Sequence, residues 1–328
     1  MTLSLAERVR AGDARAMARA ISLIEDEAES AAALVRDIFP HTGRTYLLGV
    51  TGPPGAGKST LVDRLATQTR EAGETVGVIA VDPTSPFTGG AILGDRLRMQ
   101  AHAQDPDVFI RSMATRGHMG GLARATSDAA LVLDAAGKSL VIIETVGVGQ
   151  DEVDIVRTAD ISVVVLVPGA GDDVQALKAG IMEIADIFVV NKCDRDGADR
   201  MVTSIESNLA LQHFADGEWR PPIVKTEATT GRGVPELWET IQAFRARSEG
   251  TRARRLKARN EFRLRDLLTH RFMEHVEKTL MSPSEFEALV DRIAKREVDP
   301  YTAASDILSK ALKPGAGSRE PGAGNSPK

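Results

Sequence analysis

The chain has 328 residues, of which 42% are hydrophobic and 27% are charged, and its formal net charge at pH 7 is −5. This length allows one sizeable core with appendages, so we expect one catalytic domain with helical additions. The negative charge argues against a general nucleic-acid-binding surface. No nucleic-acid partner is therefore expected, and the densest basic run, 252–259, is interpreted as a solvated helical face.

The first residues of the chain and its cysteine content indicate the cellular compartment in which we expect the protein. Residues 1–19 carry charges scattered among apolar side chains, unlike a secretory signal, and no apolar run reaches membrane-spanning length. We expect a cytoplasmic protein with no membrane partner. The one cysteine, Cys193, cannot form an internal disulfide or a multi-thiolate metal site, and the six histidines show no metal-ligand spacing.

A helical pattern opens the chain and gives way to short buried strands. Residues 3–39 have apolar side chains at helical spacing after Asp13, a candidate N-cap, and predict an N-terminal helical arm. Continuous apolar runs then alternate with helical stretches such as 58–72 and 120–136. Such runs are typical of strands buried on both faces, so we predict an α/β fold with a mostly parallel sheet. The predicted strands are 46–50, 75–81, 108–112, 139–144, 161–167, 186–190 and 222–226.

Beyond Pro235 the pattern stays helical. Ser282 and Glu285 predict a capping box, and Asp299 with Pro300 predicts the start of a further helix. An apolar stripe before these caps serves either dimerisation or docking, or it packs on the parent domain. The stripe consists of Phe262, Leu267, Leu268, Phe272, Val276 and Leu280. We divide the chain into an N-terminal helical arm (1–43), a central α/β domain (44–248), a C-terminal helical dimerisation extension (249–312) and a disordered Gly/Pro/Ser-rich tail (313–328).

A phosphate-binding loop joins the first strand to the helix 58–72. Its sequence is Gly52-Pro53-Pro54-Gly55-Ala56-Gly57-Lys58-Ser59. The glycines let backbone N–H groups surround phosphates, and the helix N-terminus adds a favourable dipole. Lys58 would neutralise the β- and γ-phosphates during catalysis, and Ser59 would ligate Mg²⁺. We expect nucleotide contacts from Gly52, Gly55, Ala56, Gly57, Lys58, Ser59 and Thr60.

Carboxylates follow two later strands, at the edge where parallel sheets bind ligands. Asp82 ends the second strand and Asp95 closes the polar loop after it, although either side chain could instead cap a helix. Glu144 ends the apolar run 140–143 and is predicted to hold Mg²⁺ directly or through water, as a catalytic residue. Gly147 can offer its N–H to the γ-phosphate.

The exit of the strand 186–190 predicts which base is bound. It carries Asn191-Lys192-Cys193-Asp194, the Asn-Lys-x-Asp pattern. Asp194 can accept hydrogen bonds from guanine N1–H and the exocyclic amine, neither of which adenine offers in that place, so the pattern selects GTP and GDP. Lys192 would lie along the base, and Asn191 would tie this loop to the phosphate loop.

Two further positions depart from common GTPase patterns. Glu227-Ala228-Thr229 follows the last strand, where GTPases commonly place Ser-Ala to bind the base oxygen through the Ala N–H, and Glu227 replaces that serine. Val148 stands where many small GTPases carry a water-orienting Gln, so we expect slow intrinsic hydrolysis. Together these motifs predict that 44–248 is a P-loop GTPase domain.

Several longer motifs carry a family resemblance. They are VDPTSP (81–86), GGAILGDR (89–96), RGHMGG (116–121), ETVGVGQ (144–150), PGAGDD (168–173) and KAGIME (178–183). Over roughly 13–312 the chain resembles the MeaB/ArgK/MMAA G-proteins, which belong to the dimeric SIMIBI branch of P-loop GTPases.

The resemblance implies a partner and a homodimer. Members of this family act as chaperones of adenosylcobalamin-dependent acyl-CoA mutases such as methylmalonyl-CoA mutase, and they gate cofactor loading and removal of damaged cofactor with GTP as the timer. The resemblance also implies a Mg²⁺ site at Ser59, Asp82, Asp95 and Glu144.

Three switch segments follow from the same resemblance: 82–95, 145–153 and 168–178, of which the third would face the mutase. A partner that orders this third loop could recruit Lys178 for catalysis. Alternatively, 169–178 is only a strand-to-helix connection with Lys178 on a solvated face.

Two other classes share parts of this pattern. A small-molecule kinase would also use Lys58 and Ser59, but it would carry an arginine-rich substrate lid and would not need Asp194. A nickel-type metallochaperone GTPase would share the fold but needs Cys and His ligands on its switches, which this sequence lacks.

Overall fold

The computed structural model describes residues 3–82, 102, 104–114, 121–145, 159–169, 179–215 and 217–312. The predicted site residues Asp95, Gly147 and Lys178 lie outside these residues, as do the side chain of Asp82 and the predicted disordered tail. Among the described helices, none combines the length and apolar character that a membrane crossing requires.

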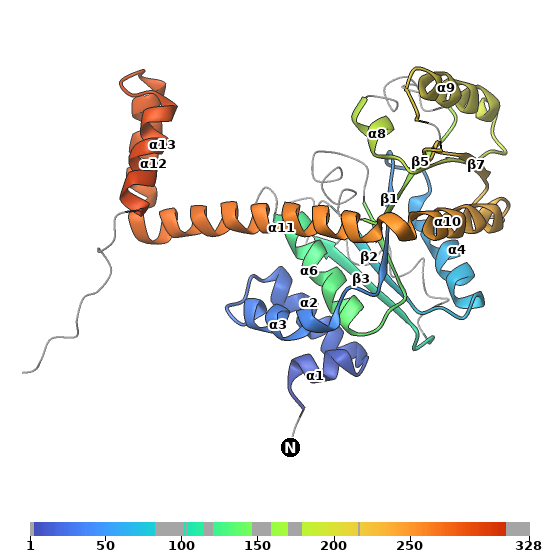
Figure 1. Ribbon diagram of the computed structural model, residues 1–328, viewed down its shortest axis with the longest axis horizontal. Helices are drawn as coiled ribbons and strands as arrows, with labels where there is room; N and C mark the ends of the chain where they lie inside the picture. Colours follow the sequence, from blue (N-terminus) through green and yellow to red (C-terminus); the bar gives the residue numbers. More distant parts are fainter. Residues whose placement is uncertain are drawn as a thin grey trace, which may run out of the picture. The chain divides into compact units, whose positions relative to one another are not determined.

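A parallel sheet of seven strands forms the centre of the fold, in the order β3-β2-β4-β1-β5-β6-β7 (Figure 1). Every pair of neighbouring strands runs parallel. The strands are β1 Tyr46–Thr51, β2 Val76–Asp82, β3 Val108–Ala114, β4 Leu140–Glu144, β5 Ile161–Leu166, β6 Ile187–Asn191 and β7 Ile223–Thr226. The predicted α/β class with a parallel sheet is therefore confirmed. Because all carboxyl ends meet at one edge, the loops after the strands can build a single site.

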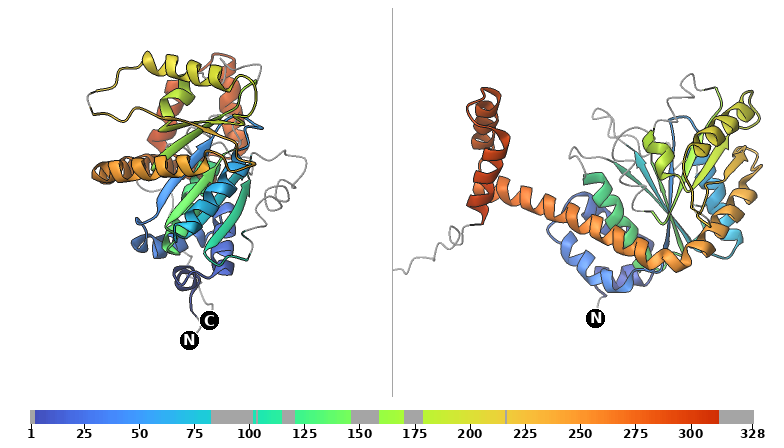
Figure 2. Two further views of the ribbon diagram at one scale, coloured as in Figure 1. Left: turned by 90° about the vertical axis from the view of Figure 1, so that its right-hand side faces the viewer. Right: turned by 45° about the horizontal axis from the view of Figure 1, so that its top comes forward.

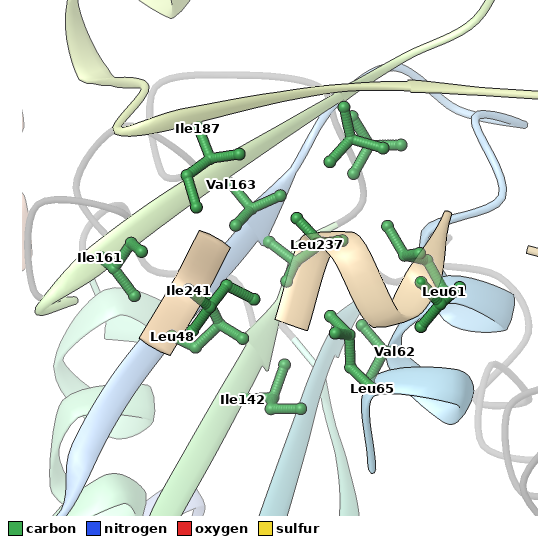
Figure 3. Packing of buried hydrophobic residues seen from close by; sticks show 14 of the residues in the cluster. Leu48, Leu61, Val62, Leu65, Ile142, Ile161, Val163, Ile187, Leu237 and Ile241 are labelled. Atoms are coloured by element: carbon green, nitrogen blue, oxygen red, sulfur yellow. The ribbon is translucent and has the colours of Figure 1, made fainter. Parts of the chain in front are cut away.

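Helices cover both faces of the sheet (Figure 2). Leu48, Ile142 and Val163 of one face are fully buried against Leu65 and Leu237 of α4 and α10 (Figure 3). The other face packs against the N-terminal helices and α6 on one side and against α8 and α9 on the other. The helices are α1 Leu5–Arg10, α2 Ala14–Glu25, α3 Ala31–Ile38, α4 Lys58–Glu71, α6 Gly121–Ala135, α8 Ala179–Ile184, α9 Ala198–Ala210 and α10 Val234–Ser248.

The N-terminal helices are part of the folded core. Asp13 caps α2 by accepting the backbone N–H groups of Arg15 and Ala16 at 2.8 and 3.1 Å, so the predicted N-cap is confirmed. Met17 and Ile21 of α2 are almost fully buried in the cluster that covers this face of the sheet. Burying these side chains stabilises the fold by roughly 1.5–3 kcal/mol each.

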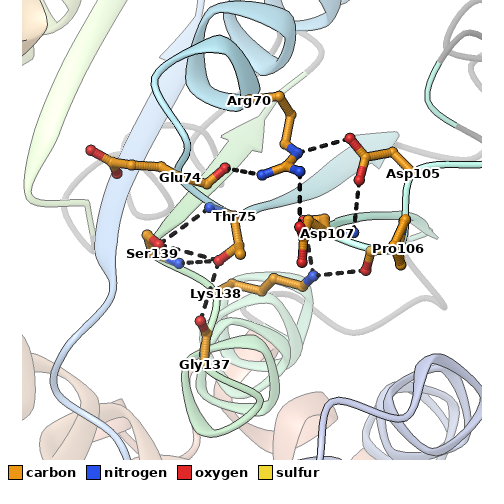
Figure 4. A network of polar contacts seen from close by, with 9 residues as sticks. All are labelled: Arg70, Glu74, Thr75, Asp105, Pro106, Asp107, Gly137, Lys138 and Ser139. Carbon is orange, nitrogen blue, oxygen red and sulfur yellow. Dashed lines mark hydrogen bonds and ion pairs between the residues drawn. The ribbon is translucent and has the colours of Figure 1, made fainter.

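A polar network fastens the sheet at the edge opposite the carboxyl ends (Figure 4). The Arg70 guanidinium near the end of α4 donates to Asp105 and Asp107, which precede β3, at 2.8 Å each. Lys138, just before β4, donates to the Asp107 carbonyl at 2.9 Å, and burial lowers the pKa of its ammonium. The network therefore fixes where β3 and β4 begin.

The basic run 252–259 also contacts this edge. Arg252 donates to the carbonyl of Arg44 at 2.9 Å, and Arg255 donates to the carbonyl of Asp160 at 2.6 Å. Arg259 pairs with the buried Asp160 carboxylate at 3.3 Å. The interpretation of this run as a solvated face is therefore wrong for these three arginines, which bind oxygens at the amino ends of the strands.

The chain divides into two compact units, residues 1–259 and 260–328. The second unit contains the end of α11 (Arg252–His275), a π-helical turn at Val276–Leu280, α12 (Pro283–Ala294) and α13 (Pro300–Ala311). Ser282 and Glu285 form the predicted capping box, and Asp299 caps α13. Val276 and Ala303 are buried within this unit. The segment boundaries at 43, 248 and 312 stay predictions.

Candidate functional site

The loop between β1 and α4 has a shape that its glycines make possible. Gly52 has φ +141°, and a Cβ there would lie 2.0 Å from the Val165 carbonyl oxygen. Gly57 has φ +85°, and a Cβ there would lie 2.5 Å from the Asn191 side chain. A side chain at position 52 would clash with the β5 backbone, and one at position 57 would displace the Asn191 amide and adopt a strained left-handed φ, so both positions favour glycine. The loop thus lies against β5 and the exit of β6.

Lys58 begins α4 and points back into this loop. Its side chain is buried, and its ammonium donates to the carbonyls of Gly52 at 2.6 Å and Pro53 at 3.0 Å. A cation held inside a loop of backbone N–H groups, at the N-terminus of a helix, suits a polyphosphate. The Lys58 ammonium therefore lies in the loop that is predicted to bind the phosphates.

Ser59 and Glu144 meet at the sheet edge. The Ser59 hydroxyl donates to Glu144 Oε1 at 2.6 Å. Glu144 reaches this place because β4 lies beside β1 with Glu144 in register with Val50, and Thr145 N–H donates to the Val50 carbonyl at 3.0 Å. A hydroxyl and a carboxylate are oxygen ligands of the kind Mg²⁺ prefers, so this pair fits the ion.

Asp82 and Asp95 are the other two residues predicted to hold the metal. β2 pairs with β4 so that Ala80 is in register with Glu144, which puts the backbone of Asp82 two residues further along the neighbouring strand. Asp95 lies outside the described residues, as does Gly147. Within the described ranges, no group of three or more His, Cys, Asp or Glu side chains could hold a metal ion.

Asn191 connects three segments of the site. Its Nδ2 donates to the Ala56 carbonyl of the phosphate loop at 2.8 Å. Its Oδ1 accepts the Thr226 hydroxyl at 3.0 Å and the Ala228 N–H at 3.1 Å. Asn191 is buried, so these hydrogen bonds are shielded from water and contribute about 1 kcal/mol each. The phosphate loop and the two loops predicted to bind the base are thereby held together.

Lys192 and Asp194 follow Asn191 in the loop after β6. Lys192 adopts φ +56°, a left-handed conformation, and its ammonium donates to the Gly55 carbonyl at 2.7 Å. Asp194 is exposed. Its carboxylate is therefore accessible to a base that enters from solvent.

Two arginines hold the last loop, and the sequence analysis missed both. Arg64, on α4, donates to the carbonyls of Ala228 at 3.1 Å and Thr229 at 2.8 Å. Arg232 lies 3.7 Å from the Glu227 carboxylate and donates to Cys193 Sγ at 2.9 Å. The contacts of Arg64 with Ala228 and of Arg232 with Cys193 join residues far apart in the chain and leave no local pattern. For Arg232, the signal in the sequence was the unusual Glu227 five residues before it.

A glycine-rich loop between the central strand and a helix, with an inward lysine and an oxygen-ligand pair at the carboxyl edge of a parallel sheet, defines a nucleotide-binding protein of the P-loop class. Comparison with known proteins gives the family. Residues 17–281 match the sequence profile described as Methylmalonyl Co-A mutase-associated GTPase MeaB. The chain belongs to the MeaB family and is a GTPase that binds guanine nucleotides.

Individual relatives agree with this assignment. The chain is similar to a Pyrococcus abyssi protein named as a candidate GTPase, with 52% identity over 96% of this chain and 98% of the relative. It is 40% identical to the GTPase ArgK of Escherichia coli over 73% of this chain and 74% of that protein. The mouse protein named methylmalonic aciduria type A homolog, mitochondrial, is 35% identical over 82% of this chain and 66% of the relative.

A solved structure of a protein named LAO/AO transport system kinase has the same fold. It superposes with a TM-score of 0.69 at 28% identity, and the match covers 94% of this chain and 97% of that chain. The resemblance seen in the sequence motifs, including the family, is therefore confirmed.

Proposed function

We propose that this GTPase is a Mg²⁺-dependent chaperone of an adenosylcobalamin-dependent acyl-CoA mutase, methylmalonyl-CoA mutase or a close relative. In this proposal GTP binding and hydrolysis gate cobalamin loading and protect or reactivate the mutase. The observation that carries it is the match of residues 17–281 to a family described as associated with methylmalonyl-CoA mutase. The name of the mouse relative, which refers to methylmalonic aciduria, supports the same client.

In this proposal, different residues of the site bind different parts of the nucleotide. Lys58 and the backbone N–H groups of 52–60 would bind the phosphates, and Ser59 with Glu144 would hold Mg²⁺ beside them. When bound, Mg²⁺ neutralises charge that develops on the transferred phosphoryl group. Gly147 and Asp95 would complete this part of the site.

The base would be held by the loops that Asn191 joins. Asp194 would accept the N1–H and amine of guanine, Lys192 would lie along the ring, and the backbone of 227–229 would approach the base oxygen. Since the described loops meet through Asn191 and Ala56, a bound base and bound phosphates would stabilise each other's loops.

We further propose slow intrinsic hydrolysis that the mutase stimulates, in a cytoplasmic homodimer formed through 249–312. Val148 follows Gly147 in the sequence, so a water-orienting Gln is missing at that position. A mutase that orders 168–178 could place Lys178 on the γ-phosphate. Activating side chains supplied in this way contribute about 10³–10⁵ in rate in other GTPases.

The test combines purified methylmalonyl-CoA mutase with the full chain and measures binding and GTP hydrolysis. We expect a complex, faster hydrolysis in its presence, and loss of that stimulation in Lys178→Ala with binding and basal hydrolysis unchanged. Lys257→Ala, which alters an exposed lysine of α11, is the matched control. Absence of binding would contradict the mutase as client, and full stimulation of Lys178→Ala would remove only that lysine from the mechanism.

The name of the solved relative suggests a second function, a small-molecule kinase. That activity would transfer the γ-phosphate to a substrate other than water. A preference for ATP over GTP, with phosphate appearing on an added small molecule and not in solution, would favour it.

A further inference from the structure

A short turn after β7 brings Arg232 back beside Glu227. Glu227 N–H donates to the Arg232 carbonyl at 2.9 Å, and Gly231 N–H donates to the Glu227 carbonyl at 2.9 Å. Gly233 allows this closure, because a Cβ there would lie 2.0 Å from the Lys225 carbonyl oxygen. The turn 227–232 is thus closed by backbone hydrogen bonds, and its last residue lies against its first.

The Arg232 side chain crosses from this turn to the exit of β6. Its Nη2 donates to Cys193 Sγ at 2.9 Å, and its Nε lies 3.7 Å from Glu227 Oε2. The pKa of the Arg232 guanidinium is raised mainly by its hydrogen bond to Cys193 and further by the negative charges of Glu227 and Asp194. One cation therefore lies among the groups on both loops that are predicted to surround the base.

The positive charge of Arg232 offsets a negative charge that Glu227 adds beside the predicted base site. Asp194 would accept hydrogen bonds from guanine through its carboxylate oxygens, and the Glu227 carboxylate on the adjoining loop brings a second negative charge that repels it. A serine in place of Glu227 would bring no charge. Arg232 lies close enough to Glu227 to offset its negative charge while touching the residue next to Asp194.

We propose that Arg232 is a positioning residue that sets guanine specificity, by neutralising Glu227 and holding the loop that carries Asp194. The proposal rests on Asp194 being the residue that recognises guanine. Arg232 acts through these neighbours and not on the base itself.

A double-mutant cycle with Arg232→Gln and Glu227→Ser tests the coupling in the full chain. Affinities for GDP and for IDP, whose base lacks the exocyclic amine, are measured by calorimetry. We expect Arg232→Gln to weaken the affinity for GDP by about tenfold. The affinity for IDP should fall by less, because a displaced Asp194 loses hydrogen bonds to two donors of guanine but to only one donor of the IDP base. Glu227→Ser removes the charge that Arg232 offsets, so adding it to Arg232→Gln should restore most of the lost affinity.

Controls separate this role from general effects of charge or folding. Arg195→Gln removes an exposed positive charge next to Asp194 in the sequence and should leave the GDP-to-IDP ratio unchanged. Arg232→Lys keeps the charge and should retain most of the discrimination between GDP and IDP. This variant still tests the proposal if Arg232→Gln does not fold.

Two results would overturn the proposal. If the effects of Arg232→Gln and Glu227→Ser simply add, or if GDP and IDP weaken equally, Arg232 is structural. If Asp194→Asn leaves the preference between GDP and XDP unchanged, the assignment of Asp194 fails and the role of Arg232 fails with it. An altered preference in Asp194→Asn together with an additive cycle refutes only the role of Arg232.

Discussion

The Ser59 hydroxyl donates to Glu144 Oε1 over 2.6 Å and so joins the first turn of α4 to the end of β4. The two residues are 85 positions apart in the chain. They meet because β4 lies beside β1 in the sheet, with Glu144 in register with the residue two positions before Gly52. The pair therefore depends on the strand order and not on any local motif.

Replacing Glu144 by Ala should separate metal-dependent turnover from nucleotide binding. We expect Glu144→Ala to bind GDP almost as the parent does, because the phosphate loop and Lys58 are intact. Mg²⁺-dependent hydrolysis should fall by roughly 10–100-fold, as for other groups that hold or orient a metal. Isothermal calorimetry with GDP and phosphate release in Mg²⁺ measure the two effects.

The matched control for this change is Glu206→Ala, on the exposed side of α9. It should affect neither measurement. If Glu144→Ala hydrolyses GTP at the parent's rate in Mg²⁺, the residue is structural and its contact with Ser59 only secures β4.

Changing Asp194 to Asn should alter which base the protein prefers. An amide offers a donor where the carboxylate offered only acceptors, so Asp194→Asn should lose GDP affinity and gain XDP affinity. Each mismatched pair is expected to cost on the order of 1–3 kcal/mol. Competition binding with GDP, XDP and ADP measures the change, with the neighbouring exposed Asp196→Asn as control. Equal affinity of the parent protein for ADP and GDP would contradict guanine recognition.

The sequence predicted those parts of the fold and site that have a local pattern. Buried strands have continuous apolar runs, and Gly52 and Gly57 lie where backbone geometry favours glycine. The strand order could not be predicted from these patterns, because it depends on which helices cover which face. For the same reason, the contacts of Arg64 with Ala228 and Thr229 had no signature before the structure.

Runs of charged residues likewise cannot be assigned their partners from the sequence alone. A run of arginines at 252–259 has the composition of a solvated helix, but Arg255 and Arg259 bind the carbonyl and carboxylate of Asp160. The composition of the run shows that it is charged. The partner of these arginines is determined by the fold, which brings the residue just before β5 beside the first part of α11. Asp160 and Arg259 are 99 residues apart.

These arginine contacts decide where the C-terminal extension can be removed. Truncation after Arg259 keeps Arg252, Arg255 and Arg259 and should give a folded GTPase unit that is monomeric, whereas the intact chain is predicted to be a dimer. Truncation after Gly250 should also give a monomer, but one with a lower melting temperature, because buried Asp160 loses its charged partner. Light scattering and thermal unfolding measure these outcomes.

A monomeric mass for the intact chain at micromolar concentration would contradict dimerisation. Equal melting temperatures for the two truncated chains would show that the arginine contacts contribute nothing measurable to stability.

Asp186, just before β6, should make stability depend on pH. Burial raises the pKa of its carboxyl to about 6, although Arg255 at 3.7 Å and the Ser162 N–H at 2.9 Å both favour the ionised form. The folded state therefore holds this proton at pH values where the unfolded chain, with a pKa near 3.8, has lost it. Between about pH 4 and pH 6 the folded state binds more protons, so the free energy of unfolding falls as the pH rises, by up to roughly 3 kcal/mol from this group.

Asp186→Asn isolates that contribution, because the amide oxygen can still accept the Ser162 N–H and the side chain never ionises. The variant's free energy of unfolding, minus that of the parent, should rise between pH 4 and pH 6 and then stay level. Urea unfolding of both proteins at pH 4, 5, 6 and 7 measures the difference. Arg255→Gln should push the pKa of Asp186 higher, since it removes the nearby positive charge, and the decline in stability should then continue above pH 6. A difference between Asp186→Asn and the parent that does not change with pH would mean that the carboxyl titrates alike in the folded and unfolded chains.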